Sequence, residues 1–400
     1  MTEGQSSGGT SDGGRIGLAG AWAIGVGGMV GGGIFSTLGV VIASAGHWAA
    51  LSFVLGGLIA YATGHSLAQL TLDADEAGGI YSFLRDSGAK RMARLSALVL
   101  LAGYVLTCAV YAYTFGAYLG HAIGGPAWLP PAMAAAAILA MTAINLLGAG
   151  QATGIEIFIV VVKLTILAGL AVLGLTQWDL SALSIPSQPG VMGVVIGAAS
   201  VFMAYEGFEL LAYDYDEMKD RKALMGRIMP LAIGSAALIY VLVAIAVPML
   251  TGTKAVIEQG EVALSLAGKA ALGTPGLIAV TVAAAFSTAS AINATLFSSA
   301  RLSREVASDG ALPGLLAKRN DRGSPYWSVL AIAGLALVLA IIGGLDGLVS
   351  GASIVFLLVF GTLNAMAYRK KVGRRWITLP GSIGAFASIA VLAAHFAGLI

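Results

Sequence analysis

Long apolar runs separated by short polar segments make up almost all of this sequence. Each run is about as long as a helix needs to cross a bilayer core of roughly 30 Å. The runs lie near residues 16–44, 48–72, 93–122, 128–148, 154–176, 191–213, 228–250, 276–307, 326–344, 347–368 and 377–399. This pattern predicts an all-α integral membrane protein with about 11 transmembrane helices.

The composition agrees with this prediction, since 58% of the residues are hydrophobic and 10% are charged, against about 25% charged residues in a soluble domain. Residues 1–14 are polar and rich in Gly and Ser. We expect them to form a disordered cytoplasmic tail without a cleavable signal peptide, followed by one transmembrane domain over 15–400. The four histidines have no metal-ligand spacing, and no phosphate loop or catalytic triad is visible. We therefore expect no metal, no cofactor, no nucleic-acid partner and no enzyme activity.

The basic residues predict an orientation in the membrane. Of the 22 Lys and Arg, 19 lie in the tail or in the loops that follow spans 2, 6, 8 and 10. Lys254 and Lys269 fall on the opposite side, and Lys163 lies in neither set of loops. Cytoplasmic loops carry the excess of Lys and Arg, so we expect a plasma-membrane protein with its N-terminus in the cytoplasm and its C-terminus outside.

The first ten spans can be divided into two consecutive sets of five. The first span of each set, which is span 1 or span 6, carries an unusual sequence. The first contains "GVGGMVGGGIF", residues 25–35, and the sixth contains "FMAYEGFELLAY", residues 202–213. Interrupted helices at matching positions of two halves indicate an inverted-repeat transporter with its binding site at the breaks. We therefore expect breaks in helices 1 and 6, repeats over about 16–176 and 191–368, and an extra helix over about 377–399.

The glycines of the first span allow two interpretations. Amides freed by a break at Gly31, Gly32 and Gly33 could hold an anion such as a carboxylate. The spacing of Gly27 with Gly31 and of Gly28 with Gly32 is also typical of close helix packing. We interpret the stretch as a binding loop, with packing as a secondary use.

Ionisable residues at membrane depth are candidates for function. Lys163 lies about 13.5 Å into the fifth span, counted from Gly154 at 1.5 Å per residue. An ammonium group at that depth must pair, face water or lose its proton, so we expect a role in proton coupling. Glu206 and Glu209 lie three residues apart in the sixth span, and either could bind a cationic group, carry a proton or pair with Lys163.

Two further spans carry polar side chains. Tyr104, Thr107, Cys108 and Tyr111 share one face of the third span, and "FSTASAIN" in the eighth contains Ser287. Small hydroxyl residues also serve simply to pack membrane helices, so packing stays open as an alternative for both spans.

Several segments resemble the amino acid–polyamine–organocation (APC) family of transporters. "GGGIF" is similar to the family's first-span signature, "GGIYSFLR" (78–85) to its cytoplasmic helix motif, and "FMAYEGFELLAYDYDE" to its sixth span. The most specific match is "FSTASAINATLFSSARLSREVASDGALP" (286–313), and "GASIVFLLVF" resembles the tenth span. The resemblance therefore covers spans 1–10.

This resemblance implies a leucine-transporter-like fold of five plus five inverted helices, with a substrate site between spans 1, 3, 6, 8 and 10. It implies that the amides of the first-span motif bind the substrate carboxylate and that sixth-span carbonyls bind its amino group. The substrate-binding residues expected in this way, with the third-span face included, are Gly31, Gly32, Gly33, Ile34, Tyr104, Thr107, Tyr205, Glu206 and Gly207.

The resemblance also implies coupling residues. Lys163 matches a lysine of proton-linked or exchanging relatives and stands where sodium-driven relatives place a sodium ion, between spans 1 and 8. Glu209 matches an acidic position linked to proton sensing, and Ser287 is expected beside Lys163. The implied coupling ion is H⁺. Glu206 departs from the family pattern, and a carboxylate there would favour a cationic amine.

We therefore expect a secondary active transporter of amino acids or related amines that is proton-coupled and works by alternating access. Its partners would be a small-molecule substrate and the lipid bilayer, and nothing predicts its oligomeric state. One alternative is an obligate exchanger in which Lys163 does not titrate. Alternatives of other classes are a membrane nutrient sensor without net transport, and a channel.

Overall fold

The computed structural model describes residues 16–399 apart from 148–152, 180–181 and 183–189, so the tail expected over 1–14 lies outside the described residues. The long helices are α1 (Leu18–Ala45), α2 (Ala49–Ala74), α4 (Lys90–Ile123), α5 (Leu129–Leu146), α6 (Thr153–Thr176), α9 (Arg221–Thr251), α12 (Thr274–Ser308), α13 (Tyr326–Ile342), α14 (Leu345–Lys370) and α15 (Arg375–Phe396). The sixth span is made of α7 (Val191–Ser200), η3 (Val201–Glu209) and α8 (Leu210–Tyr213). The short helices are η1 (Gly46–Trp48), α3 (Ile80–Asp86), η4 (Tyr215–Glu217), α10 (Thr253–Glu258), η5 (Gly260–Val262), α11 (Ala263–Leu272) and η6 (Gly314–Ala317).

These helices confirm the predicted spans. Each apolar run corresponds to one long helix, or in the sixth to the succession of α7, η3 and α8. Within the described residues, nine helical segments are long and apolar enough to cross a membrane when α1 and α2 are counted together, and the 17-residue α13 is a shorter apolar helix. The protein is therefore a multi-pass integral membrane protein.

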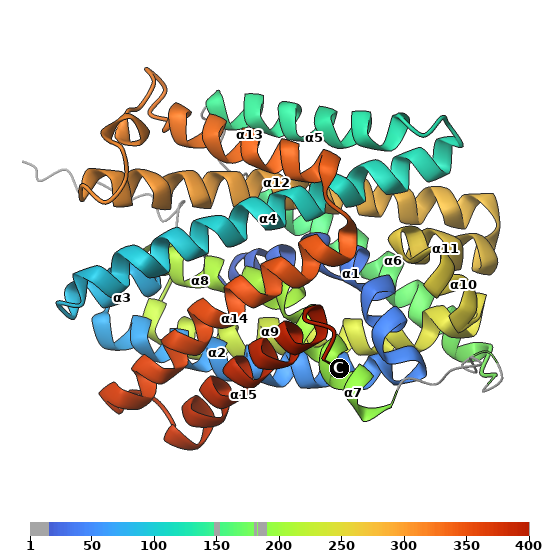
Figure 1. Ribbon diagram of the computed structural model, residues 1–400, viewed down its shortest axis with the longest axis horizontal. Coiled ribbons are helices and arrows are strands. Elements are labelled where there is room, and N and C mark those ends of the chain that lie inside the picture. The colour runs from blue at the N-terminus through green and yellow to red at the C-terminus, as the bar shows by residue number, and fades with distance from the viewer. Residues whose placement is uncertain (1–15, 148–152, 180–181, 183–189, 400) are drawn as a thin grey trace, which may run out of the picture.

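Burial separates central from peripheral helices. In α1, 21 of the 28 residues are buried, whereas in α5 only five of 18 are. Figure 1 shows the same arrangement, with α1 in the middle of the molecule and α5 and α13 along its upper edge. Because α1 is enclosed on all sides, its glycines face other helices rather than lipid.

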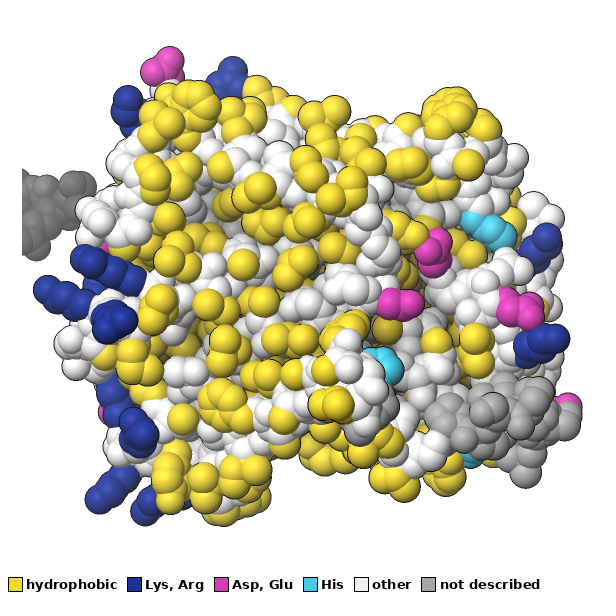
Figure 2. All heavy atoms as spheres, viewed as in Figure 1, with side chains coloured by type: hydrophobic (Ala, Val, Ile, Leu, Met, Phe, Trp, Pro, Cys, Tyr) yellow, Lys and Arg dark blue, Asp and Glu magenta, His cyan; other side chains and the backbone are white. Residues whose placement is uncertain are grey.

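The surface is apolar around the middle and charged at its ends. Figure 2 shows hydrophobic side chains over most of this face, with Lys and Arg gathered at one end of the molecule, which we call the basic end. Leu98, Val161 and Leu335 are among the large apolar side chains that lie exposed on the outer helices. Exposed apolar side chains in this number suit contact with lipid rather than water.

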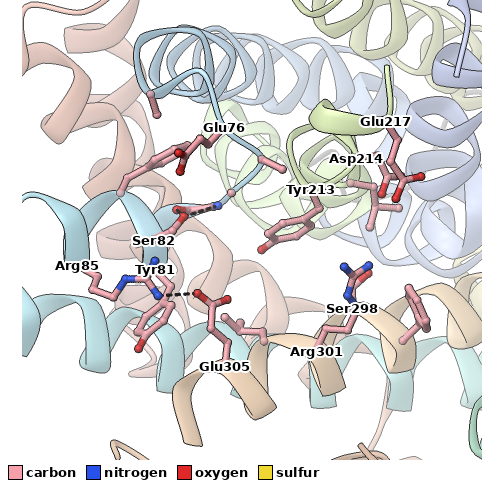
Figure 3. Close-up of a pocket in the computed structure, with 18 of the residues that line it drawn as sticks. Glu76, Tyr81, Ser82, Arg85, Tyr213, Asp214, Glu217, Ser298, Arg301 and Glu305 are labelled. Atoms are coloured by element: carbon pink, nitrogen blue, oxygen red, sulfur yellow. Dashed lines mark hydrogen bonds and ion pairs between the residues drawn. The ribbon is translucent and has the colours of Figure 1, made fainter. Parts of the chain in front are cut away.

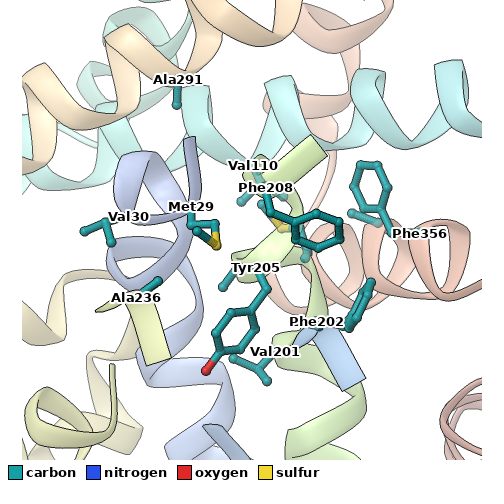
Figure 4. Close-up of a cluster of buried hydrophobic side chains, with 14 of the residues drawn as sticks. Met29, Val30, Val110, Val201, Phe202, Tyr205, Phe208, Ala236, Ala291 and Phe356 are labelled. Atoms are coloured by element: carbon teal, nitrogen blue, oxygen red, sulfur yellow. The ribbon is translucent and has the colours of Figure 1, made fainter. Parts of the chain in front are cut away.

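The sixth span is interrupted, as predicted. Between α7 and α8, residues Val201–Glu209 form nine residues of 3-10 helix, and all nine are buried. Runs of 3-10 helix longer than three or four residues are uncommon and often mark a functional hinge. Figure 4 shows Phe202 and Phe208 of this segment turned toward Phe356 of α14, while Tyr205 points the other way.

The predicted break in the first span is absent from this conformation. Helix α1 runs without interruption from Leu18 to Ala45, through the whole glycine-rich stretch. The glycines instead bring α1 into direct contact with η3. This packing explains why a sequence that disfavours helix by about 1 kcal/mol per glycine is helical here.

Candidate substrate and coupling site

The middle of α1 touches η3 backbone to backbone. A Cβ atom at Gly207 would lie 2.2 Å from the carbonyl carbon of Gly28, and one at Gly33 would lie 2.7 Å from the carbonyl oxygen of Ala204. Ordinary Cβ contacts begin near 3.4 Å, so any side chain at these positions would force the two segments apart. Glycine on both sides therefore fixes this contact.

The other glycines of the expected binding loop face different helices. A Cβ atom at Gly31 would lie 3.0 Å from Cβ of Ala291 in α12, and one at Gly32 would lie 2.0 Å from the ring of Tyr111 in α4. Ile34 follows them and is completely buried. The stretch thus contacts spans 3, 6 and 8, which are three of the spans expected to form the substrate site.

Two side chains from other spans bond to carbonyl groups of this same stretch. Lys163 of α6 is 2% exposed, and its Nζ donates a hydrogen bond of 3.0 Å to the carbonyl oxygen of Gly27. Ser287 of α12 donates through Oγ to the carbonyl oxygen of Val30 at 3.0 Å. The structure therefore places Lys163 and Ser287 on neighbouring turns of α1, where they bond different carbonyls.

Tyr240 of α9 is a third residue bound to this stretch, and the sequence analysis missed it. Its hydroxyl lies 2.7 Å from the carbonyl oxygen of Met29 and 2.9 Å from that of Ala204. It therefore connects α1 to η3 at their closest approach. A single tyrosine in an apolar span does not form a pattern that predicts a site. The one available indication is that a buried hydroxyl needs a hydrogen-bond partner.

The two sixth-span carboxyl groups lie together in the protein interior. Glu206 is 5% exposed and Glu209 is 3% exposed, and their three-residue spacing in the 3-10 segment puts both side chains on the same face. Tyr104 of α4 donates a hydrogen bond from its hydroxyl to Oε1 of Glu209, and the hydroxyl of Tyr213 lies 3.3 Å from that of Tyr104. Two buried carboxyl groups this close require a proton or a cation between them, because burying two unpaired negative charges is very costly.

Tyr205 and Thr107 complete the expected set of binding residues. The Tyr205 hydroxyl donates to the carbonyl oxygen of Phe53 at 2.8 Å, so its side chain is held by α2. Thr107 is fully buried, and its hydroxyl has no hydrogen-bond partner among the described residues. An unsatisfied buried hydroxyl is unusual and suits a group that bonds to a substrate or to water.

A small cavity lies between α1, α4, α12 and the sixth span, and three of the expected substrate-binding residues, Tyr104, Glu206 and Gly207, line it. Its volume is about 20 Å³, enough for about one water molecule but not for an amino acid. Its walls come from spans 1, 3, 6 and 8, namely Gly28, Tyr104, Tyr111, Glu206, Gly207, Leu210, Ala291, Ala294, Thr295 and Ser298. The structure thus represents a conformation in which the centre of the candidate site is nearly closed.

Two larger cavities lie toward the two ends of the molecule. The cavity at the basic end has a volume of about 470 Å³, and it shares Leu210 and Ser298 with the central cavity. Figure 3 shows Tyr213 pointing into it beside Ser298 and Arg301. The cavity at the opposite end has a volume of about 820 Å³ and includes Glu261 in its wall.

Charged groups border the cavity at the basic end. Arg85 of α3 bonds to Glu305 of α12 at 2.7 Å (Figure 3) and also to Asp309 at 3.3 Å. Tyr81 donates to Asp309 at 2.5 Å, and this bond holds the pKa of Asp309 below its ordinary value. Partial burial and the neighbouring Asp309 raise the pKa of Tyr81 to about 12. These contacts join α3 to the end of α12.

A comparison with protein families decides the class of this protein. The family described as "Amino acid permease" matches residues 16–399, which is nearly the whole chain. The chain belongs to the amino acid permease family. It is thus a member of the APC transporters, as its motifs predicted, and its family consists of transporters rather than enzymes.

Curated relatives agree with this membership. The chain is 30% identical over 364 residues to the inner membrane transport protein YbaT of Escherichia coli (strain K12), covering 88% of this chain and 83% of the relative. It is 28% identical over 371 residues to the methylthioribose transporter of Bacillus subtilis (strain 168), covering 86% of this chain and 76% of that transporter. It is 26% identical over 357 residues to the serine/threonine exchanger SteT of the same organism, covering 86% of this chain and 80% of the exchanger. These permease relatives support membrane transport of amino acids or related compounds.

Solved structures confirm the fold of the permease. A manganese transporter of Eremococcus coleocola superposes with a TM-score of 0.65 at 12% identity, covering 96% of this chain and 86% of that one. At this identity the likeness concerns the fold alone. The permease therefore has the leucine-transporter-like fold that its sequence implied.

Proposed function

We propose that this permease is a proton-coupled secondary transporter of amino acids or related amines in the plasma membrane. In this proposal the basic end is cytoplasmic, the N-terminus lies inside and the C-terminus outside. The observation that carries the proposal is the buried Lys163, whose Nζ bonds to the Gly27 carbonyl of α1 at 3.0 Å. A lysine in that position can gain or lose a proton and change how α6 holds α1.

Helix geometry connects the proton to substrate binding. In a continuous helix the carbonyl of Gly27 accepts the amide hydrogen of Gly31, four residues on. Lys163 bonds to that same carbonyl. A charged ammonium group forms hydrogen bonds about twice as strong as those of a neutral donor. Protonated Lys163 therefore weakens the helical hydrogen bond from the Gly31 N–H to the Gly27 carbonyl. The freed amide is then available to a substrate carboxylate.

Two further side chains act on the neighbouring amides in the same way. Tyr240 bonds to the carbonyl of Met29, which is the helical acceptor for the amide of Gly33. Ser287 bonds to the carbonyl of Val30, which is the acceptor for the amide of Ile34. Side chains from spans 5, 7 and 8 thus bond to the α1 carbonyls that accept the helical hydrogen bonds of Gly31, Gly33 and Ile34. They compete there with the amides that would bind the substrate carboxylate.

Carboxylate binding in this proposal requires local unwinding of α1 at Gly31–Gly33. The closed helix described above is then the substrate-free form. Each glycine makes the helix about 1 kcal/mol easier to open than alanine would. The glycines therefore serve both the close packing on η3 and the opening of the binding loop.

The remaining residues are assigned to the rest of the substrate. Backbone carbonyls from Tyr205 to Gly207, in the 3-10 segment, would bind the amino group. Glu206 would select for positive charge, and Glu209 with Tyr104 would respond to protonation, since they are already hydrogen-bonded. Thr107 would use its free hydroxyl on the substrate side.

Obligate exchange is the second candidate, because one relative bears the name of a serine/threonine exchanger. In that mode Lys163 stays charged and its bond to Gly27 is permanent. A membrane nutrient sensor of the same fold would bind substrate without moving it. Net uptake and substrate exchange, measured together, separate the three functions.

The decisive experiment measures uptake by wild type, Lys163→Ala and Lys163→Arg in proteoliposomes with an imposed pH step. Arginine does not deprotonate in proteins, and alanine carries no proton. Both variants should therefore lose concentrative uptake driven by the pH step. Thr165→Ala is the matched control, because Thr165 lies exposed on the same helix and bonds only within it.

Full concentrative uptake by Lys163→Arg would overturn the titrating-lysine mechanism. A wild type that exchanges substrate but ignores the pH step would establish the exchanger. Binding without uptake or exchange in any protein would establish the sensor.

A further inference from the structure

A third sizeable cavity lies apart from the transport path, between α2, α9 and α15. Its volume is about 480 Å³, within the range of pockets that hold small organic ligands, roughly 300–1,000 Å³. Figure 1 shows the three helices overlapping at the lower left of the view. None of its lining residues belongs to the candidate substrate site.

Helix α9 leaves room for this cavity. Pro230 lies inside α9 and has no backbone N–H, so the Gly226 carbonyl loses its usual intrahelical donor. Gly226 itself lines the cavity, and a Cβ atom there would meet nothing within 4 Å. Both residues are exposed, so the cavity opens at the outer surface of the helix bundle.

The wall of the cavity is apolar on one side and polar on the other. Met229, Ile233 and Ile377 supply apolar surface, and Tyr61, His65 and Gln69 of α2 supply polar groups. Among the residues that line the cavity, Arg374 alone carries a permanent charge. Its backbone N–H donates to Nε2 of His65 at 3.0 Å, which ties the loop between α14 and α15 to α2.

Neighbouring residues indicate that the cavity lies level with lipid headgroups. Trp376 is 71% exposed and lies beside Arg374, whose guanidinium carbon is 5.9 Å from the indole centroid. Exposed tryptophans of membrane proteins concentrate at the membrane–water interface. The same loop and its flanks carry a cluster of basic residues: Arg369, Lys370, Lys371, Arg374 and Arg375.

We propose that this cavity is a binding site for an anionic phospholipid of the membrane leaflet at the basic end. The headgroup phosphate contacts Arg374 and the polar groups of α2, and an acyl chain lies along Tyr61 and Pro230, which are the exposed apolar groups of the cavity wall. Charge complementarity favours an anionic lipid over a zwitterionic one, because basic pockets between helices on the cytoplasmic side attract anionic headgroups. The open outer surface of the cavity allows the lipid to bind from the bilayer.

The test uses native mass spectrometry of the purified full-length protein with phosphatidylglycerol or phosphatidylcholine added. Wild type should retain phosphatidylglycerol in preference to phosphatidylcholine. Gly226→Leu should abolish retention, since its side chain grows into the cavity. Arg374→Gln should weaken the apparent affinity about fivefold, the equivalent of roughly 1 kcal/mol for one basic residue at a membrane surface.

Two matched controls separate the cavity from general effects. Gly234→Leu makes the same change in α9 at an exposed glycine that also has nothing within 4 Å but does not line the cavity. Arg375→Gln removes the same charge one residue away, where the side chain lies over Tyr368 instead. Both controls should retain phosphatidylglycerol as wild type does.

Equal loss in Arg374→Gln and Arg375→Gln would show diffuse surface charge and overturn the proposal. Equal retention of both lipids by wild type, or unchanged retention by Gly226→Leu, would also overturn it. A dimer in wild type that disappears in Gly226→Leu would identify the cavity as an interface between two copies of the chain, which would refute the lipid assignment as well.

Discussion

Replacing Gly207 with alanine tests the contact between α1 and η3 directly. The new methyl group would lie 2.2 Å from the carbonyl carbon of Gly28 and 2.4 Å from the amide nitrogen of Met29. Ordinary contacts begin near 3.4 Å, so the two backbones must separate by about 1 Å. No flexible side chain is available to relieve the clash, because both partners are backbone.

The expected cost follows from these contacts. Inserting a methyl group into a close-packed interior costs about 1–3 kcal/mol, and the rigid partners favour the upper end. Alanine also restricts the unfolded chain relative to glycine, which offsets about 0.4–1 kcal/mol. A net loss of about 2 kcal/mol remains, or roughly a thirtyfold change in the unfolding equilibrium.

The assay is unfolding of the purified protein in mixed micelles, with Gly234→Ala as the control. Gly234 lies exposed in α9, and a methyl group added there would meet nothing within 4 Å, so alanine should stabilise the protein by about 0.5–1 kcal/mol. If Gly207→Ala proves as stable as Gly234→Ala, the backbone contact between α1 and η3 does not exist in solution.

Three other predictions concern topology, selectivity and pH. Cysteine placed at Lys90 should be protected from a membrane-impermeant reagent added outside, and cysteine at Lys254 should react. The opposite result would reverse the orientation. Glu206→Gln should weaken a cationic substrate more than a neutral one in competition assays, because bonds to charged groups are worth about 1.5–3 kcal/mol against 0.5–1.5 for neutral ones, and equal losses would argue against charge selection. Asp309 has a lowered pKa, so its pairing stabilises the protein above its ordinary pKa of 3.8 and is lost as the pH falls below that value. The stability difference between wild type and Asp309→Asn, measured by thermal unfolding, should therefore shrink below about pH 4, and a difference that grows there would contradict the assignment.

Hydrophobic length explains why the spans could be predicted so closely. A helix that crosses the bilayer needs about 20 apolar residues, and this requirement is visible in the sequence without knowledge of neighbours. The place of Lys163 could be predicted for the same reason, since its depth follows from its distance to the end of the span. The structure adds the acceptor, the Gly27 carbonyl, which the sequence did not name.

The conformation of α1 could not be predicted, because the glycine run fits a break and a packing surface equally well. The segment that packs against α1 decides between them. This segment is η3, where backbone atoms of Ala204 and Gly207 lie directly against the α1 glycines. That segment lies about 180 residues away in the chain, and no local pattern connects the two. Tyr240 was missed for a similar reason, since its two acceptors belong to two different spans.

The cavity between α2, α9 and α15 was equally invisible in the sequence. It depends on the absence of side chains at Gly226 and on the proline that follows one turn later. Small residues are common on helix surfaces. Whether one of them leaves a cavity depends on which helices pack beside it. Three segments far apart in the chain had to be placed before the space between them could be found.

The C-terminal part of α1 makes a contact that consists almost entirely of backbone. A Cβ atom at Gly39 would lie 2.3 Å from the Cα atom of Gly260 in η5, beside the cavity at the end opposite the basic one. Ordering a long flexible side chain costs about 1.5–2 kcal/mol of conformational entropy, and glycine has no side chain to order. This contact can therefore form and separate with little entropic cost. Side chains are ordered both beside this contact, where Tyr113 bonds to Glu261 of η5, and at the basic end, where Arg85 bonds to Glu305. Warming should then weaken these two side-chain contacts before it weakens the contact between the glycines.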